Sequence, residues 1–179
     1  MGLIYTGTIF DPAQPMTGLL PIVAVLFQLS TIYLGVLVGM ARARFGIPYP
    51  TMYAVAGTLR VYSDAMRTAA KDKGAAEPLS STISEEEAHG FNCVQRGHQN
   101  AVENAPYLLL MLVCAAPFPI VAAVAGVVHI IGRVLYAVGY SRGAQSRMWG
   151  AVCIYPSLLT LLVLDILTAV YLFKGTQPY

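Results

Sequence analysis

Hydrophobic residues are gathered into four long runs along this chain, separated by polar connectors of unequal length. The runs cover residues 18–40, 101–115, 120–140 and 148–173. The first, third and fourth have few or no charges and reach the roughly 20 residues that a helix needs to cross a bilayer. No internal repeat or separate domain is visible, so we predict one all-α membrane domain over residues 1–179, a bundle of four transmembrane helices.

The second run differs from the others because it continues a polar stretch without a break. Ser84 and Glu87 are three residues apart, and this capping-box pattern predicts a helix that starts near residue 85. From there to residue 115 the helix would be about 45 Å long at 1.5 Å per residue. Its first half should therefore project into water, and only its second half should lie in the membrane.

Composition supports the membrane assignment. Of the 179 residues, 56% are hydrophobic and only 11% are charged, whereas a soluble domain carries about 25% charged residues. The mean hydropathy is +0.62. A net charge of +2 without a basic run does not indicate nucleic-acid binding. The three cysteines are far apart in the sequence, so neither a metal site nor a disulfide framework is predicted.

Basic residues are concentrated in two of the three connectors. Residues 41–89 of the first connector hold six of them and the third connector holds two, whereas the second holds none. The positive-inside rule therefore places connectors one and three in the cytosol. Within the first, residues 54–89 form an extended polar connector.

The polar half of the second predicted helix carries a cation, an amide and an anion on one face. Arg96, Asn100 and Glu103 are spaced i, i+4 and i+7. Charges at the entry to a membrane are costly, and they are expected to face protein or a water-filled cavity and to serve a function. The alternative is that the three side chains satisfy one another without a ligand.

A second polar face ends the third run. Arg133, Tyr136 and Tyr140 are spaced i, i+3 and i+7, and Arg147 follows seven residues later. An interfacial aromatic belt and positive-inside anchoring are the simpler explanations for the tyrosines and Arg147. Arg133 lies deeper and needs a partner, for which Glu103 or a bound anion is the candidate. Together the two faces would suit a small polyanionic ligand that carries an amine.

Asp165 is a charge in the fourth run with apolar neighbours on both sides. Counting about 1.5 Å per residue along oppositely directed helices places His129 at a similar depth. We therefore predict an Asp165–His129 hydrogen bond that keeps the bundle in register. A role in proton transfer is the alternative.

Two blocks of the sequence carry a resemblance to a known family. The first runs from Phe91 to Asn100 and continues with Glu103 and Pro106, and the second runs from Gly132 to Tyr136 and continues with Gly139 and Tyr140. They resemble the type-3 microsomal glutathione transferases of the MAPEG family, the membrane-associated proteins in eicosanoid and glutathione metabolism. Ala41-Arg42 and the segment Tyr49 to Tyr53 fit the end of the family's first connector motif.

The resemblance implies a homotrimer of four-helix subunits that binds glutathione in a bent shape between neighbouring subunits. The matching motif positions give eight glutathione-binding residues: Arg96, Asn100, Glu103, Tyr136, Tyr140, Arg133, His98 and Arg42. Arg147 matches the arginine with which the related leukotriene C synthases stabilise the glutathione thiolate, so it would be the catalytic residue. The chain departs from its relatives at Asn104, where they have tyrosine, and in its longer first connector.

The function implied is a membrane glutathione transferase and glutathione-dependent peroxidase that activates the thiolate for attack on lipophilic electrophiles or lipid hydroperoxides. Glutathione is the co-substrate and no metal is required. The alternative is a non-catalytic MAPEG-like subunit that presents lipid or docks to a larger membrane assembly through residues 54–89. A channel or transporter is disfavoured, since no inverted repeat or broken-helix pair is visible. We expect the endoplasmic reticulum, with a mitochondrial membrane as the alternative.

Overall fold

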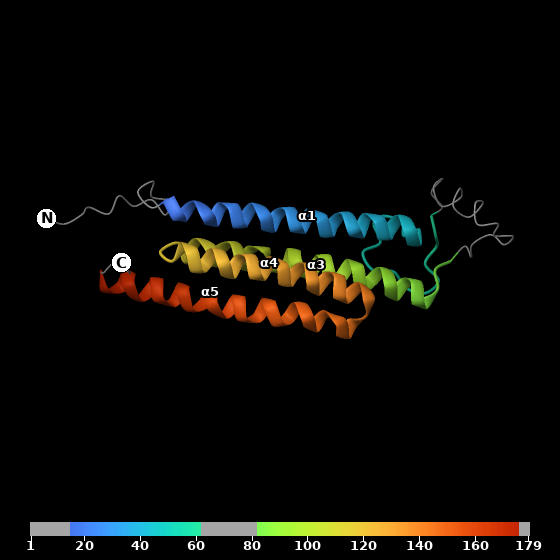
Figure 1. Cartoon of the computed structure of the whole chain (residues 1–179). Helices are drawn as coiled ribbons and strands as arrows, with labels where there is room; N and C mark the ends of the chain where they lie inside the picture. Colours follow the sequence, from blue (N-terminus) through green and yellow to red (C-terminus); the bar gives the residue numbers. More distant parts are fainter. Residues whose placement is uncertain (1–14, 62–81, 176–179) are drawn as a thin grey trace.

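Four long helices lie side by side in the computed structural model, which describes residues 15–61 and 82–175 (Figure 1). They are α1 (Leu19–Phe45), α3 (Glu85–Cys114), α4 (Pro119–Arg142) and α5 (Met148–Lys174). Two short 3-10 turns, η1 (Pro15–Gly18) and η2 (Ala144–Arg147), precede α1 and α5. No strand occurs within the described ranges, and the predicted all-α bundle is confirmed.

Three segments are long and apolar enough to cross a membrane: Met16–Phe45, Pro119–Arg142 and Gln145–Lys174. The helix α3 does not meet that criterion, because its first half is polar. It nevertheless lies antiparallel beside α4 and reaches the same end of the bundle, where the hairpin 115–118 joins the two (Figure 1). The apolar half of α3 therefore crosses the same layer as the start of α4.

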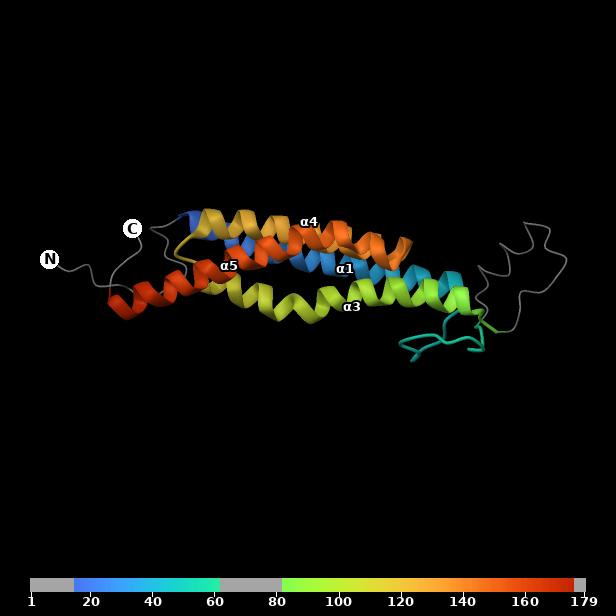
Figure 2. The same cartoon turned by 90° about the horizontal axis from the view of Figure 1, so that it is seen from below.

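The start of α3 has the predicted capping box. The Ser84 hydroxyl accepts a hydrogen bond from the Glu87 backbone N–H at 3.2 Å, and the Glu87 carboxylate accepts one from the Ser84 N–H at 2.9 Å. Pro106 lies inside the helix and removes one backbone donor. Figure 2 shows α3 bending along its length, as expected from that proline.

Helix α4 contacts α1, α3 and α5, and glycines allow the closest of these approaches. A Cβ atom added at Gly97 of α3 would lie 3.0 Å from the Ala137 Cα atom of α4. One added at Gly150 of α5 would lie only 2.3 Å from the Tyr136 backbone nitrogen. Small residues at such crossings let membrane helices pack backbone to backbone. These contacts fix the position of the polar end of α4 against both neighbours.

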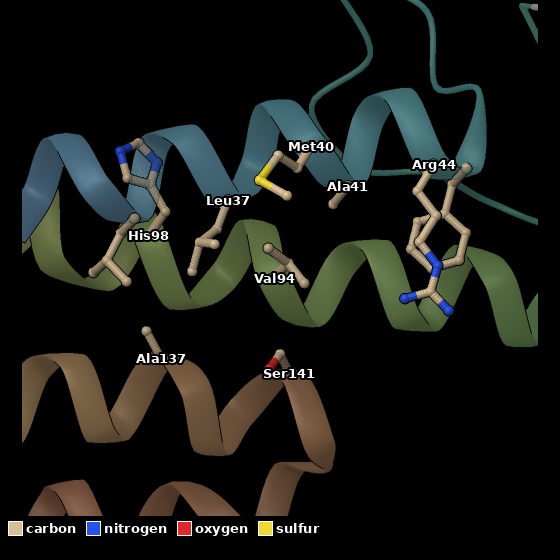
Figure 3. A pocket seen from close by; sticks show the side chains of 10 residues that line it. Leu37, Met40, Ala41, Arg44, Val94, His98, Ala137 and Ser141 are labelled. Carbon is tan, nitrogen blue, oxygen red and sulfur yellow. The ribbon is translucent and has the colours of Figure 1, made fainter. Parts of the chain in front are cut away.

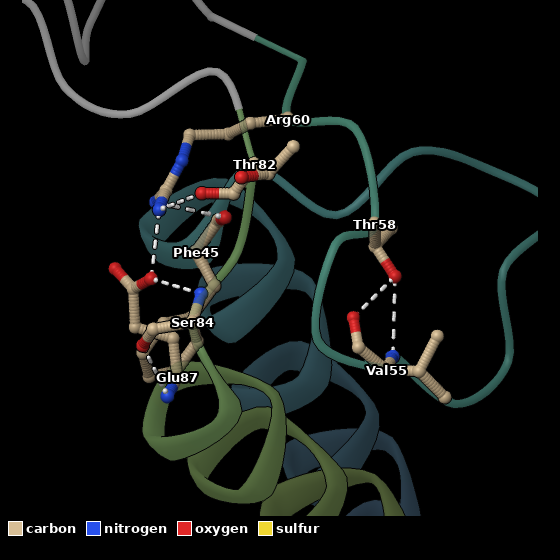
Figure 4. A network of polar contacts seen from close by, with 7 residues as sticks. All are labelled: Phe45, Val55, Thr58, Arg60, Thr82, Ser84 and Glu87. Atoms are coloured by element: carbon tan, nitrogen blue, oxygen red, sulfur yellow. Dashed lines mark hydrogen bonds and ion pairs between the residues drawn. The ribbon is translucent and has the colours of Figure 1, made fainter.

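The described part of the first connector folds back onto the start of α3. Asn92 accepts a hydrogen bond from the Ala54 N–H and donates one to the Ala54 carbonyl, both at 2.8 Å. Arg60 forms an ion pair with Glu87 at 2.7 Å and donates to the Phe45 and Thr82 carbonyls (Figure 4). The base of the connector is thereby anchored, while residues 62–81 lie outside the described part of the chain.

A buried polar chain joins α4 to α5. His129 is fully buried, its Nε2 atom accepts a hydrogen bond from Arg133 Nε at 3.1 Å, and its Nδ1 atom lies 3.2 Å from the Ser157 hydroxyl. The predicted Asp165–His129 bond is therefore wrong. Asp165 lies eight residues beyond Ser157, which is about 12 Å along the helix. Its Oδ1 atom has no hydrogen-bond partner among the described residues.

Candidate functional site

The polar face predicted on α3 exists and is accessible. Arg96 donates a hydrogen bond to the Glu103 carboxylate at 3.3 Å, and Gln99 donates to the same carboxylate oxygen at 3.0 Å. The Asn100 side-chain amide donates to the Arg96 carbonyl at 3.2 Å. The side chains of Arg96 and Glu103 are 42% and 45% exposed. This ion pair is open to a ligand rather than sealed in the bundle.

The first connector adds a phenol to this face. The Tyr53 hydroxyl donates a hydrogen bond to the Gln99 side-chain carbonyl. A hydrogen bond with Tyr53 also raises the pKa of Arg96, with smaller contributions from Glu103 and Tyr140. Tyr53 and Gln99 were not among the predicted site residues. Gln99 could have been found, because it lies four residues before Glu103 on the same helix.

The end of α4 supplies the two tyrosines, and η2 supplies an arginine. The rings of Tyr136 and Tyr140 have centroids 5.9 Å apart. Arg147 donates a hydrogen bond to the Tyr140 hydroxyl at 3.4 Å, and its guanidinium carbon lies 5.3 Å from the centroid of that ring. The two polar faces lie at the same level of the bundle, because Gly97, next to Arg96, packs closely against Ala137 of α4.

Arg133 does not join this cluster. It is only 5% exposed and donates to His129 inside the bundle. The predicted pairing with Glu103 is wrong, because Glu103 accepts from Arg96 and Gln99 instead. An arginine at membrane depth does find a partner, as expected, but the partner is the imidazole one helical turn earlier.

Arg42 and His98 also lie apart from the Arg96 face. The guanidinium of Arg42 lies 4.5 Å from the Tyr49 ring centroid, and it donates to the Pro48 carbonyl at 3.4 Å. His98 follows Arg96 by two residues, a rotation of about 200° around the helix. It lies against α1, where a Cβ atom added at Gly35 would be 3.4 Å from its Nε2 atom. Among the described residues, no hydrogen bond or ion pair joins either side chain to Arg96 or Glu103.

The model of the MAPEG family matches residues 20–169. The matched range begins in α1 and ends in α5, and it includes every residue of both polar faces.

Proposed function

The chain belongs to the MAPEG family, and from this premise we propose that it is a membrane glutathione transferase with glutathione-dependent peroxidase activity. The family consists of membrane helical bundles, includes glutathione transferases and synthases, and uses glutathione. One observation carries the proposal for this chain. The Arg96–Glu103 pair of α3 and the Tyr140–Arg147 pair of α4 and η2 lie at the same level of the bundle, where Gly97 packs against Ala137.

The cluster matches the charges of glutathione, which has two carboxylates, one amine and one thiol. Arg96 and Tyr140 hold a carboxylate, while Glu103 holds the amine and Asn100 contributes an amide. An exposed ion pair contributes only about 0–1 kcal/mol. Breaking the Arg96–Glu103 ion pair therefore costs little free energy. Glutathione replaces it with two ion pairs, one between its carboxylate and Arg96 and one between its amine and Glu103.

Arg147 activates the sulfur, assisted by Tyr136 and Tyr140. A guanidinium beside a thiol favours the anion and lowers the thiol pKa from about 8.5. In the transferase reaction the thiolate attacks an electrophilic carbon, a carbon–sulfur bond forms, and the leaving group departs with its electron pair. In the peroxidase reaction the thiolate attacks the peroxide, which leaves an alcohol and a sulfenic acid, and a second glutathione converts the latter to the disulfide and water.

The remaining predicted residues fit a site between subunits. Arg42 contacts Tyr49 and His98 packs against α1, and in our proposal a neighbouring copy brings them to glutathione. A homotrimer that binds glutathione between its subunits explains why Arg42 and His98 do not contact Arg96 within one subunit. Arg133 then acts indirectly, by holding α4 to α5 through His129.

The orientation and location are part of the same proposal. Several arginines gather at the connector end of the bundle, among them Arg44, Arg60, Arg142 and Arg147. The positive-inside rule then puts this end in the cytosol. We place the protein in the endoplasmic reticulum, where its lipophilic substrate enters from the bilayer. Protease protection in sealed microsomes tests the orientation: the first connector should be cleaved from the cytosolic side.

The test is glutathione conjugation to an aryl halide by the purified protein, combined with the ultraviolet absorbance of the thiolate on adding glutathione. Arg96→Ala should weaken glutathione binding by about 10- to 100-fold. Arg147→Ala should bind glutathione but form no thiolate, with turnover reduced about 100-fold or more. Lys174→Ala, at the opposite end of the bundle, is the matched control. Glutathione binding by the wild type without thiolate or turnover would overturn the proposal and favour the non-catalytic alternative.

A further inference from the structure

The first connector places one tyrosine against the Arg96 face of α3. Two hydrogen bonds of 2.8 Å from the Asn92 side chain hold the backbone of Ala54, whose side chain is buried. Tyr53 directly precedes this anchor, and its hydroxyl donates a hydrogen bond to the Gln99 side-chain carbonyl. Asn92 and Gln99 lie about two helical turns apart, so the connector follows α3 from the anchor toward the membrane. Tyr53 is thus held against α3 although it lies outside any helix.

The side of α3 that carries His98 faces other helices instead. Figure 3 shows His98 beside a cavity of about 300 Å³, which Leu37 of α1 and Ala137 of α4 also line. A second cavity, of about 720 Å³, lies at the connector end of the bundle. Neither Tyr53 nor Gln99 lines either cavity, so their contact lies outside both.

Gln99 connects Tyr53 to the carboxylate of Glu103. The side-chain nitrogen of Gln99 donates a hydrogen bond to that carboxylate at 3.0 Å, while its side-chain oxygen accepts from Tyr53. An ionised carboxylate only accepts and a phenol can donate, so this amide orientation satisfies both ends. Without the phenol as donor, the amide can rotate and turn its oxygen toward the carboxylate, which repels it. The Tyr53 hydroxyl therefore selects the orientation in which Gln99 supports Glu103.

Both donors to Glu103 use the same carboxylate oxygen. Arg96 and Gln99 each donate to Oε1, and no described residue donates a hydrogen bond to Oε2. The Oε2 atom is therefore the one that can accept from a ligand amine. In the proposed function, Arg96 leaves Glu103 in order to bind a carboxylate of glutathione. Gln99 then remains as the donor that holds the Glu103 side chain, which is 45% exposed.

We propose that Tyr53 is a positioning residue of the glutathione site, which orients Glu103 through Gln99 so that the site selects a ligand with a free amine. The inference rests on the proposed function and adds to it a residue of the first connector. Tyr53 acts through another side chain, so its loss should change the affinity for the amine and leave the chemistry at the sulfur intact.

The test is isothermal titration with glutathione and with deaminoglutathione, the analogue in which hydrogen replaces the amine. Tyr53→Phe keeps the ring and removes one hydrogen bond, so it should weaken glutathione binding by about 3- to 10-fold. Arg96 keeps all its donors for the carboxylate, and deaminoglutathione has no group for Glu103, so the affinity for this analogue should be unchanged. Turnover at saturating glutathione should also be unchanged.

Tyr171→Phe is the matched control. It removes a phenol hydroxyl at the other end of the bundle, where the ring packs on Phe118 with centroids 6.2 Å apart. This variant should bind both ligands as the wild type does.

A double variant tests whether the effect passes through Gln99. Gln99→Leu should itself weaken glutathione binding, and adding Tyr53→Phe to it should cause no further loss. Additive losses, unchanged affinity in Tyr53→Phe, or an equal loss for both ligands would each overturn the inference while the proposed function stands. A wild type that does not bind glutathione would instead overturn the proposed function, and the inference with it.

Discussion

The two ends of this bundle are built from the same four helices but on different principles. Near the hairpin 115–118, the interior is one apolar cluster, and its members include Phe27, Leu108, Leu112, Ala122 and Leu161. Near the first connector, a smaller apolar cluster that includes Ile83, Ala88 and Phe91 lies beside the Arg96–Glu103 ion pair, the paired tyrosines and two cavities. The difference indicates that stability and function are separated along the bundle. Changes at one end should affect folding, and changes at the other should affect ligands.

The largest effect that tests this separation is the loss of Arg96 at the connector end. Arg96→Gln removes a charged donor from the proposed carboxylate site, and such contacts contribute about 1.5–3 kcal/mol. Glutathione affinity should fall by about 10- to 100-fold while the unfolding temperature stays unchanged. Isothermal titration and thermal unfolding in detergent measure the two quantities. If the free energy of unfolding fell as much as the free energy of glutathione binding, stability and function would not be separated along the bundle.

At the hairpin end the corresponding change is Gly126→Leu. A Cβ atom at Gly126 would lie 2.5 Å from Val23 Cγ1 and 3.2 Å from Leu112 Cδ2. Such overpacking costs about 1–3 kcal/mol, so the unfolding temperature should fall by several degrees. Gly39→Leu is the matched control, because no atom lies within 4 Å of its added Cβ. Equal losses in the two variants would show that the hairpin end is not tightly packed.

The Arg60–Glu87 pair should make the connector acid-sensitive. Hydrogen bonds from Arg60 and from the Ser84 backbone lower the pKa of Glu87 from its usual value of 4.5. A lowered folded-state pKa adds stability that is present above pH 4.5 and is lost as the pH falls through the folded-state value. Proteolysis of the connector should therefore accelerate below about pH 4.5.

Glu87→Gln should remove most of that pH dependence, whereas Glu85→Gln at the first position of α3 should keep it. Proteolysis rates that are independent of pH in the wild type would exclude the pair as an anchor.

The smallest effect is expected at Asp165. Its Oδ1 atom is buried and has no hydrogen-bond partner in the described part of the chain. Because a charge at membrane depth is costly, Asp165→Asn should leave the unfolding temperature unchanged or slightly raised. His129→Ala should lower it, since Arg133 loses its acceptor. A clear loss of stability in Asp165→Asn would reveal a partner for the carboxylate outside this subunit.

Residue spacing along a single helix predicted which side chains contact one another. Closeness in the sequence did not. The i, i+7 spacing of Arg96 and Glu103 and the capping box at Ser84 both appear in the structure. His98 belongs to the same motif as Arg96, yet two residues along a helix mean nearly opposite sides. A sequence motif therefore does not define one site within one subunit.

Contacts between helices were harder to predict. Counting depth along the spans placed Asp165 beside His129, but the packing of α4 on α5 brings Ser157 there instead. Tyr53 was missed as a site residue for another reason. It lies in a non-helical connector, where no periodicity indicates which way a side chain faces.

The most direct test of the central claim is an experimental structure of the protein purified with glutathione. We predict density for the tripeptide beside Arg96 and Tyr140, with its amine at Glu103 and its sulfur near Arg147. Glutathione bound anywhere that does not contact Arg96, or no bound glutathione at saturating concentration, would contradict the account.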